Sequence, residues 1–117
     1  MENVIYYLST CTTCKRILSE IDTKDLVLRE IKSMPISENE IEEMHSLSGS
    51  YEALFSRRAR KYAELGLKDQ KLAEEDYKKY IMDEYTFLKR PVAIIDGEIF
   101  VGNSKKNVEA LIAKVNS

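Results

Sequence analysis

The sequence predicts an α/β domain built on a four-stranded mixed sheet, in which a βαβ unit comes first and a ββα unit comes last. Two observations support this prediction. Residues 3–8 and 26–31 are short runs rich in β-branched, aromatic and aliphatic side chains, with a helix-like segment between them. Two strands joined by a helix form a right-handed parallel crossover. Residues 92–95 and 98–101 are strand-like runs separated by an Asp-Gly pair, which is typical of a two-residue β-hairpin turn.

Each predicted unit also contains a helix, which is indicated by capping residues and helical spacing. Thr12 or Thr13 is expected to cap the first helix, because a threonine hydroxyl accepts a hydrogen bond from an unpaired N–H at a helix start. Ile17 and Ile21 then fall on one face of that helix. Ser104 is expected to cap the last helix in the same way.

Between the two units, about residues 34–88 are predicted to form a helical insertion within a single domain that spans residues 1–117. Ser37 followed by Glu40 resembles a capping box, which opens a helix. Gly49 is expected to end that helix, because glycine accepts the left-handed conformation of a helix C-terminus.

A short helix is predicted over residues 51–55, and two longer helices are predicted over residues 57–65 and 71–82. Gly66 is expected to stop the helix over residues 57–65. The helix over residues 71–82 carries Tyr77 and Ile81 at helical spacing, so these side chains are expected on its apolar side.

The composition is that of a globular protein, since 44% of the residues are hydrophobic and 32% are charged. A net charge of −2 gives no general attraction to nucleic acid or to a membrane, so neither is expected as a direct partner. No apolar run approaches the roughly 20 residues of a membrane span, and the first residues lack the features of an export signal. We therefore expect a cytoplasmic protein, in a compartment that keeps thiols reduced.

The residues best suited to chemistry are Cys11 and Cys14, which lie where the first strand leads into the first helix. A helix N-terminus stabilises the thiolate, the reactive form of cysteine. Cys11, at the helix entrance, is the predicted nucleophile, and Cys14, one turn further in, is the predicted resolving thiol that closes a disulfide onto it. Thr12 and Thr13 form the rest of the loop, and Lys15 adds positive charge nearby.

One other interpretation of the cysteines is open. Both would be inert if they were small core residues, as free cysteines often are. A zinc site needs four protein ligands, or three and a water, whereas the chain has two cysteines and one histidine. No metal is therefore expected.

Arg90 and Pro91 are a second candidate element of the site. A proline that opens a strand after a polar residue and before a hairpin favours a cis peptide bond. A cis-proline would place backbone beside the thiol loop, where a substrate could pair with it. An ordinary trans proline at a strand start is the alternative.

Arg57 and Arg58 belong to the densest basic run in the sequence, and Arg90 is expected to join them across the fold. Planar guanidinium groups bind oxyanions through two hydrogen bonds at once. Near a thiolate they would hold such an anion and stabilise the charge that develops during attack. The alternative is a solvated helix face, which is the usual place of a charge run.

Taken together, these motifs resemble the ArsC/Spx family, which contains glutaredoxin-like arsenate reductases and the Spx regulators. The resemblance extends over nearly the whole chain. It is carried by Cys11-Thr12-Thr13-Cys14-Lys15-Arg16, Ser56-Arg57-Arg58, Tyr62-Ala63-Glu64-Leu65-Gly66-Leu67, Lys89-Arg90-Pro91-Val92 and Val101-Gly102-Asn103.

The resemblance implies a thioredoxin-like fold and a thiol-dependent oxidoreductase that acts on a small oxyanion or on a thiol or disulfide substrate. Cys11 would form a covalent adduct with arsenate, and Arg90 together with Arg58 or Arg57 would bind the anion. No bound cofactor is implied. Electrons would come from glutathione with glutaredoxin, or from thioredoxin.

The chain departs from the arsenate reductases of the family in three places. Tyr7 stands where they have a histidine that is thought to help activate the thiol, and Val101-Gly102-Asn103 stands where they have a third arginine. The loop has two cysteines rather than one. The last two features favour the alternative function, an Spx-like redox-sensing transcriptional regulator that binds RNA polymerase and uses Cys11 and Cys14 as its switch.

Overall fold

The computed structural model describes residues 2–117, which form two compact units. Unit 1 consists of the residues up to Met34 together with Arg90–Ser117, and unit 2 consists of Pro35–Lys89. The single domain predicted over residues 1–117 stays a prediction, and each unit is described below by itself.

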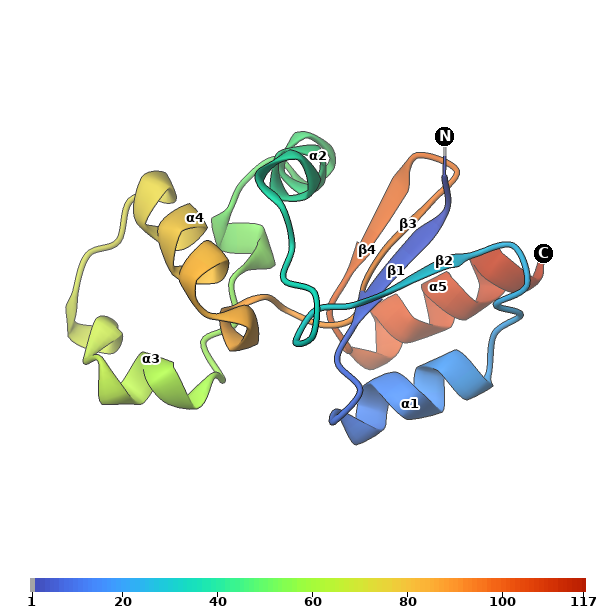
Figure 1. Ribbon diagram of the computed structural model, residues 1–117, viewed down its shortest axis with the longest axis horizontal. Helices are drawn as coiled ribbons and strands as arrows, with labels where there is room; N and C mark the ends of the chain where they lie inside the picture. The colour runs from blue at the N-terminus through green and yellow to red at the C-terminus, as the bar shows by residue number, and fades with distance from the viewer. Residues whose placement is uncertain (1) are drawn as a thin grey trace. The chain divides into compact units, whose positions relative to one another are not determined.

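Unit 1 is an α/β structure with a mixed sheet. Its elements are β1 (Val4–Tyr7), α1 (Thr12–Ser19), β2 (Val27–Glu30), β3 (Val92–Ile95), β4 (Glu98–Val101) and α5 (Lys105–Asn116). The strands form one four-stranded sheet in the order β2-β1-β3-β4. β1 runs parallel to β2 and antiparallel to β3, which pairs antiparallel with β4. The predicted order of a βαβ unit followed by a ββα unit is therefore confirmed (Figure 1).

The hairpin between β3 and β4 has the turn that its sequence predicts. Asp96 has a φ of 51° and Gly97 a φ of 78°, and a two-residue turn of this kind needs positive φ at both positions. The side chain of Asn3 secures the turn, since its Oδ1 accepts a hydrogen bond from the Asp96 N–H at 2.9 Å.

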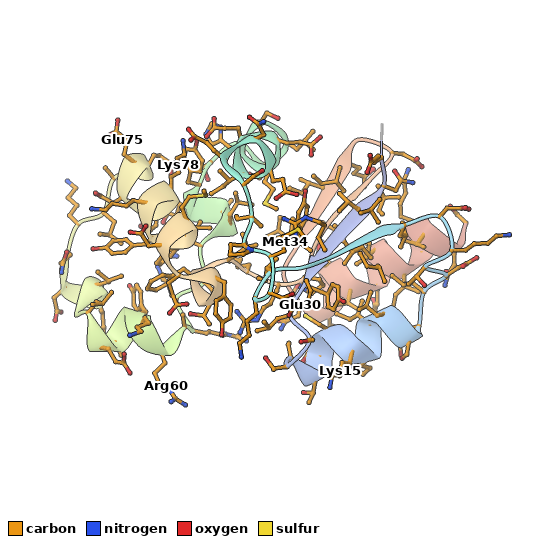
Figure 2. The ribbon with its side chains drawn as sticks, in the orientation of Figure 1. Lys15, Glu30, Met34, Arg60, Glu75 and Lys78 are labelled. Carbon is orange, nitrogen blue, oxygen red and sulfur yellow. The ribbon has the colours of Figure 1, made fainter. Side chains whose placement is uncertain are left out.

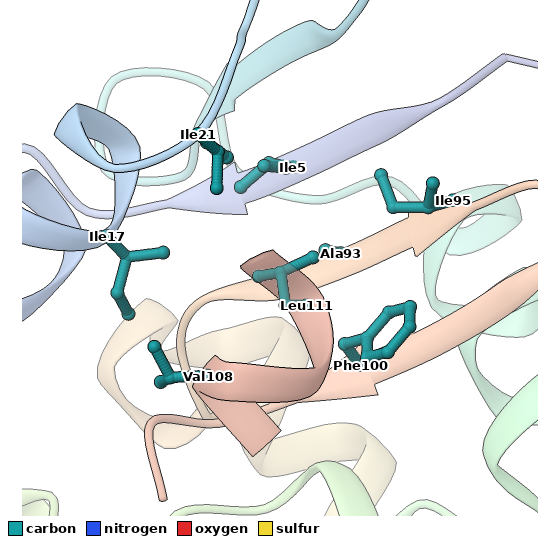
Figure 3. Close-up of a cluster of buried hydrophobic side chains, with 8 residues drawn as sticks. All are labelled: Ile5, Ile17, Ile21, Ala93, Ile95, Phe100, Val108 and Leu111. Carbon is teal, nitrogen blue, oxygen red and sulfur yellow. The ribbon is translucent and has the colours of Figure 1, made fainter. Parts of the chain in front are cut away.

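The core of unit 1 lies between the sheet and the two helices α1 and α5. Alternate residues of three strands face the same side of the sheet, where side chains from both helices cover them (Figure 3). The cluster consists of Ile5, Ile17, Ile21, Ala93, Ile95, Phe100, Val108 and Leu111. Burial of these side chains holds α1 against the sheet and so positions the loop that leads into it.

Unit 2 is helical and is organised around aromatic side chains. Its elements are α2 (Glu38–Ser48), η1 (Glu52–Leu54), α3 (Arg60–Glu64), η2 (Leu67–Asp69), α4 (Glu74–Asp83) and η3 (Tyr85–Phe87). Phe55 stacks on Phe87 with ring centroids 4.9 Å apart and meets the edge of Tyr77 at 5.0 Å. An antiparallel bridge joins Phe55 to Leu88, so the residue after η1 pairs with the residue after η3.

The capping box predicted at the start of α2 is confirmed. The Ser37 Oγ accepts a hydrogen bond from the Glu40 N–H at 3.1 Å, and the Glu40 carboxylate accepts one from the Ser37 N–H at 2.8 Å. Gly49 ends the helix with a φ of 90°, as the sequence predicts.

Two helices of unit 2 begin later than predicted. The helix predicted over residues 57–65 is limited to α3, because the Ser56 N–H pairs with the Phe87 carbonyl at 2.7 Å and the chain turns before Arg60. The helix predicted over residues 71–82 starts at Glu74, where the Asp76 carboxylate accepts a hydrogen bond from the N–H of the extended residue Ala73. Three acidic residues fill the first turn of α4, which the helix dipole favours.

None of the helices in residues 2–117 is long and apolar enough to cross a membrane.

The core of unit 1 predicts a clear contrast between two leucine substitutions. Leu111 is 0% exposed in the core cluster, whereas Leu28 is 43% exposed on the edge strand β2. We expect Leu111→Ala to lower the free energy of unfolding by about 2–5 kcal/mol and Leu28→Ala to lower it by less than about 1 kcal/mol. Urea titration of both variants measures the difference, and equal losses would contradict this description of the core.

Candidate active site

A tight turn at the end of β1 presents Cys11 to the start of α1. The Cys11 N–H donates a hydrogen bond to the Leu8 carbonyl at 3.0 Å, which closes a turn through Ser9 and Thr10. The backbone of Cys11 is extended, with φ −89° and ψ 114°, and this residue takes the N-cap position of α1.

The prediction that Thr12 or Thr13 caps this helix is wrong. The carbonyl of Cys11 already accepts the first helical hydrogen bond, from the Lys15 N–H at 3.1 Å, so the helix begins one residue earlier than the threonines allow. The site at which a serine or threonine hydroxyl commonly caps a helix is therefore occupied by the Cys11 thiol. This placement exposes the sulfur to the unpaired N–H groups of the first turn.

The environment of Cys11 favours its thiolate. Cys11 is partly buried, and this burial by itself raises the pKa of the thiol. The backbone N–H groups of Cys14 and Thr13, the Cys14 side chain and the charge of Arg90 act in the opposite direction, so the pKa of Cys11 lies below its ordinary value. The N–H groups have this effect although the thiol closes no full capping hydrogen bond.

Cys14 has the opposite environment. Its side chain is 0% exposed, and this burial raises the pKa of the thiol to about 11. The neighbouring Cys11 contributes to this increase through its negative charge and the hydrogen bond between the two side chains, while a backbone hydrogen bond from Leu8 and the charge of Arg90 act against it. Near neutral pH Cys14 is therefore a protonated thiol, and the neighbouring Cys11 ionises more readily than an ordinary cysteine.

Arg90 and Pro91 lie next to the thiols because of the strand order. Val92 pairs with Tyr6 near the end of β1, so the residues before β3 come to the edge of the sheet where the cysteine loop begins. The Arg90–Pro91 peptide bond is cis, as the sequence predicts. The positive charge of Arg90 lowers the pKa of both cysteines.

The other predicted loop residues differ in exposure. Thr13 is half-buried, and its N–H acts on the Cys11 thiol. Thr12 is exposed at the helix start. Lys15 is exposed on α1 (Figure 2).

Arg57 and Arg58 belong to unit 2. The Arg57 guanidinium donates to the Glu52 carboxylate at 2.6 Å and to the Tyr77 hydroxyl at 3.2 Å. It also lies 5.8 Å from the centre of the Tyr77 ring, so Arg57 links two parts of unit 2. Arg58 is exposed. Their predicted role in anion binding stays a prediction.

Glu30 also contacts the cysteine loop, although no sequence motif indicates it. Its carboxylate accepts a hydrogen bond from the Ser9 N–H at 2.8 Å, although 21 positions separate the two residues. The predicted parallel pairing of the first two strands could have indicated this contact, because the carboxyl ends of parallel strands meet at the same edge of a sheet. Figure 2 labels Glu30 at the end of β2.

In residues 2–117, no group of three or more histidine, cysteine, aspartate or glutamate side chains is arranged to hold a metal ion. The chemistry that this arrangement supports is that of two neighbouring thiols and a guanidinium. A thiolate is a nucleophile, and a neighbouring thiol can convert its covalent product into a disulfide.

The environment of Cys11 predicts its alkylation behaviour. We expect iodoacetamide to modify Cys11 with a pH midpoint below the ordinary thiol value of about 8.5, because the N–H groups of α1 and the charge of Arg90 stabilise its thiolate. Arg90→Met should raise that midpoint. Mass spectrometry of the Cys11 peptide across a pH series measures it.

Arg16→Met is the matched control, because the Arg16 guanidinium pairs with Glu20 on the exposed side of α1 and is not among the groups that favour the thiolate. An Arg90→Met midpoint no higher than that of Arg16→Met would refute the role of Arg90.

The contacts of Glu30 predict how acid affects stability. Hydrogen bonds from the backbone of Ser9 and Ser33 lower the pKa of Glu30 from 4.5 to about 2. Because this pKa is lower in the folded protein, the stabilisation is complete above about pH 4.5 and is lost as the pH falls toward 2. Glu30→Gln should therefore unfold at lower urea concentration than the parent at pH 7, and the gap should narrow below pH 4.5. Glu98→Gln, an exposed change on β4, should produce no such gap.

Comparisons with known proteins agree with this description. The model of the ArsC family matches residues 6–111. Among curated proteins, no sequence matches the chain significantly. Among solved structures, the YffB protein has a TM-score of 0.80 at 19% sequence identity, with 97% of this chain and 98% of that chain covered.

Two other similar structures bear names that mention an activity. A possible arsenate reductase from Streptococcus mutans UA159 has a TM-score of 0.74 at 25% identity, with 93% of this chain and 96% of that chain covered. An arsenate reductase from Vibrio cholerae has a TM-score of 0.73 at 18% identity, with 98% of each chain covered. The family match extends over most of the chain, from β1 to α5, and the structural likeness extends over nearly all of it. The chain therefore belongs to the ArsC family and has its thioredoxin-like fold.

Proposed function

We propose that the protein is a thiol-dependent oxidoreductase of the arsenate-reductase type, in which Cys11 is the nucleophile. The opposite environments of the two thiols are the observation that carries this proposal. The pKa of Cys11 is lowered at the N-terminus of α1, whereas burial raises the pKa of Cys14 to about 11. Membership of the ArsC family and the names of the relatives from S. mutans and V. cholerae support the same activity.

In the first step the Cys11 thiolate attacks the arsenic atom of arsenate. A sulfur–arsenic bond forms, one arsenic–oxygen bond breaks, and the departing oxygen leaves as water after it takes up protons. Arg90 has a guanidinium that suits both roles required here, holding the anion and offsetting its charge as the thiolate approaches.

The second step uses Cys14 as the resolving thiol. Once Cys11 is bonded to arsenic, it no longer carries the negative charge that helps to raise the pKa of Cys14. Adduct formation removes this contribution and the hydrogen bond from Cys11, and with Arg90 offsetting the charge of the bound arsenate, Cys14 ionises more readily as the second step begins. Cys14 attacks the Cys11 sulfur, the sulfur–arsenic bond breaks, and its electron pair reduces arsenic from the +5 to the +3 state.

The products are arsenite and a Cys11–Cys14 disulfide, which an external donor must reduce by two electrons. Glutathione with glutaredoxin, or thioredoxin, supplies thiols of the required kind. Glutathione can also take the place of Cys14 and attack Cys11 directly. A disulfide substrate would react with the same thiolate by exchange.

We assign the second anion-binding arginine to Arg58 rather than Arg57. The Arg57 guanidinium already pairs with Glu52 and Tyr77, and leaving these partners would cost charge-assisted hydrogen bonds. The Arg58 side chain is exposed. The Spx-like regulator stays a prediction, because no contact in residues 2–117 favours a surface for RNA polymerase.

Turnover of arsenate by the purified protein tests the proposal. We expect arsenite production with the glutathione–glutaredoxin system, the thioredoxin system, or both, and Cys11→Ser should abolish it with either donor. Cys14→Ser should lose turnover with thioredoxin but keep turnover with glutathione, because glutathione can replace the resolving thiol. Absence of arsenite with every donor, while Cys11 stays hyper-reactive, would rule out arsenate as the substrate.

Arg58 can be tested in the same assay. We expect Arg58→Ala to raise the KM for arsenate about tenfold or more, which is the loss expected for one charge-assisted contact. Arg60→Ala is the matched control, since Arg60 lies two residues further along at the start of α3 (Figure 2). Equal KM values for the two variants would contradict the assignment.

A further inference from the structure

The carboxylate of Glu30 connects two loops that lie at the same edge of the sheet. Glu30 is the last residue of β2, and its position in the register is opposite Tyr7, the last residue of β1. The parallel pairing continues one step further, since the Ile31 N–H donates to the Tyr7 carbonyl at 3.0 Å. The cysteine loop follows β1 and a turn over residues 31–34 follows β2, so the two loops start side by side.

Each oxygen of the Glu30 carboxylate binds a different loop. Oε2 accepts a hydrogen bond from the Ser9 N–H at 2.8 Å. Oε1 accepts three hydrogen bonds from the turn, from the Lys32 N–H at 2.9 Å, the Ser33 N–H at 2.7 Å and the Ser33 hydroxyl at 2.9 Å. The Met34 N–H closes that turn on the Glu30 carbonyl at 3.1 Å.

Ser9 is the point at which this carboxylate can influence the reactive thiol. It lies inside the turn that the Cys11 N–H closes on the Leu8 carbonyl. A restraint on the Ser9 N–H therefore restrains the backbone two residues before the nucleophile. Because Ser9 and Thr10 are both exposed, core packing does not restrain the turn at these two residues.

We propose that Glu30 is a positioning residue, which holds the loop before Cys11 in the shape that keeps its thiol at the N-terminus of α1. This inference rests on the proposed function, in which Cys11 is the nucleophile. The N–H groups of Thr13 and Cys14 favour the thiolate only while the sulfur stays beside them, and hydrogen-bond interactions weaken steeply with poor geometry. A loop that shifts would lose part of this stabilisation.

The chemistry of the contacts explains why a glutamate suits this position. All four groups around the carboxylate are donors, and an ionised carboxylate only accepts. A glutamine would turn its NH₂ group toward one of the loops, where it meets donors. An aspartate would keep the charge but is one methylene shorter, so it cannot reach both loops.

A direct electrostatic effect of Glu30 on Cys11 would have the opposite sign. A nearby negative charge disfavours a thiolate, so removing the Glu30 charge would lower the pKa of Cys11 if charge alone mattered. The positioning role requires that loss of Glu30 raises this pKa. The direction of the change therefore separates the two explanations.

The experiment is a pH series of iodoacetamide alkylation at Cys11, followed by mass spectrometry, in the full chain and in Glu30→Gln, Glu30→Asp and Glu98→Gln. We expect both Glu30 variants to raise the midpoint and to slow alkylation at pH 7 by about three- to tenfold, because the rate follows the thiolate fraction. Glu98→Gln, the matched control on β4, should behave as the parent does. Thermal unfolding confirms that each variant is folded. If Glu30→Gln does not fold, the alkylation midpoint of Glu30→Asp alone tests the positioning role.

The results distinguish failure of this inference from failure of the proposed function. A parent midpoint at or above about 8.5 would refute the activated nucleophile and this role of Glu30 with it. A parent midpoint below that value, with Glu30 variants that leave it unchanged or lower it, would refute the positioning role alone.

Discussion

The parallel pairing of β1 with β2 is the constraint on which the candidate site depends. Parallel neighbours need a crossover connection, and here α1 provides it, so a helix must begin near the carboxyl end of β1. The same pairing brings the carboxyl end of β2, with Glu30, to that edge. Because β3 runs antiparallel on the other side of β1, its first residues, preceded by Arg90, arrive there too. One strand order thus assembles the thiol, the guanidinium and the carboxylate from three separate segments.

The division of roles that we propose for the two cysteines follows from their places on one helix. Cys11 takes the N-cap position, where unpaired N–H groups face the sulfur, whereas Cys14 lies one turn inside and is fully buried. The helix terminus stabilises negative charge, and burial opposes it. A spacing of three residues thus gives the two thiols opposite environments, and the charge of Cys11 contributes to the raised pKa of Cys14.

Unit 2 uses its aromatic and charged residues largely for its own stability. Phe55 stacks on Phe87 and meets Tyr77, while Arg57 joins Glu52 to the same tyrosine. A basic run in a sequence is thus not a single functional unit, because Arg57 is held by Glu52 and Tyr77 whereas the neighbouring Arg58 is exposed. Only a side chain without such structural partners can bind an anion at little cost, and this physical reason underlies the choice of Arg58 over Arg57.

The sequence by itself determined those features that a few contiguous residues encode. These are the four strands, the Asp96-Gly97 turn, the capping box of Ser37 and the placement of a cysteine pair at a helix start. Helix starts were less predictable, since α4 begins where the Asp76 carboxylate can accept a hydrogen bond from the Ala73 N–H. Only the tertiary structure decided that Glu30 holds the Ser9 N–H and that the charge of Arg90 reaches both thiols. Local hydrogen bonding and periodicity can be predicted from neighbouring residues. Contacts between distant segments depend on strand order and register, which are set by the packing of side chains from distant parts of the chain into one core.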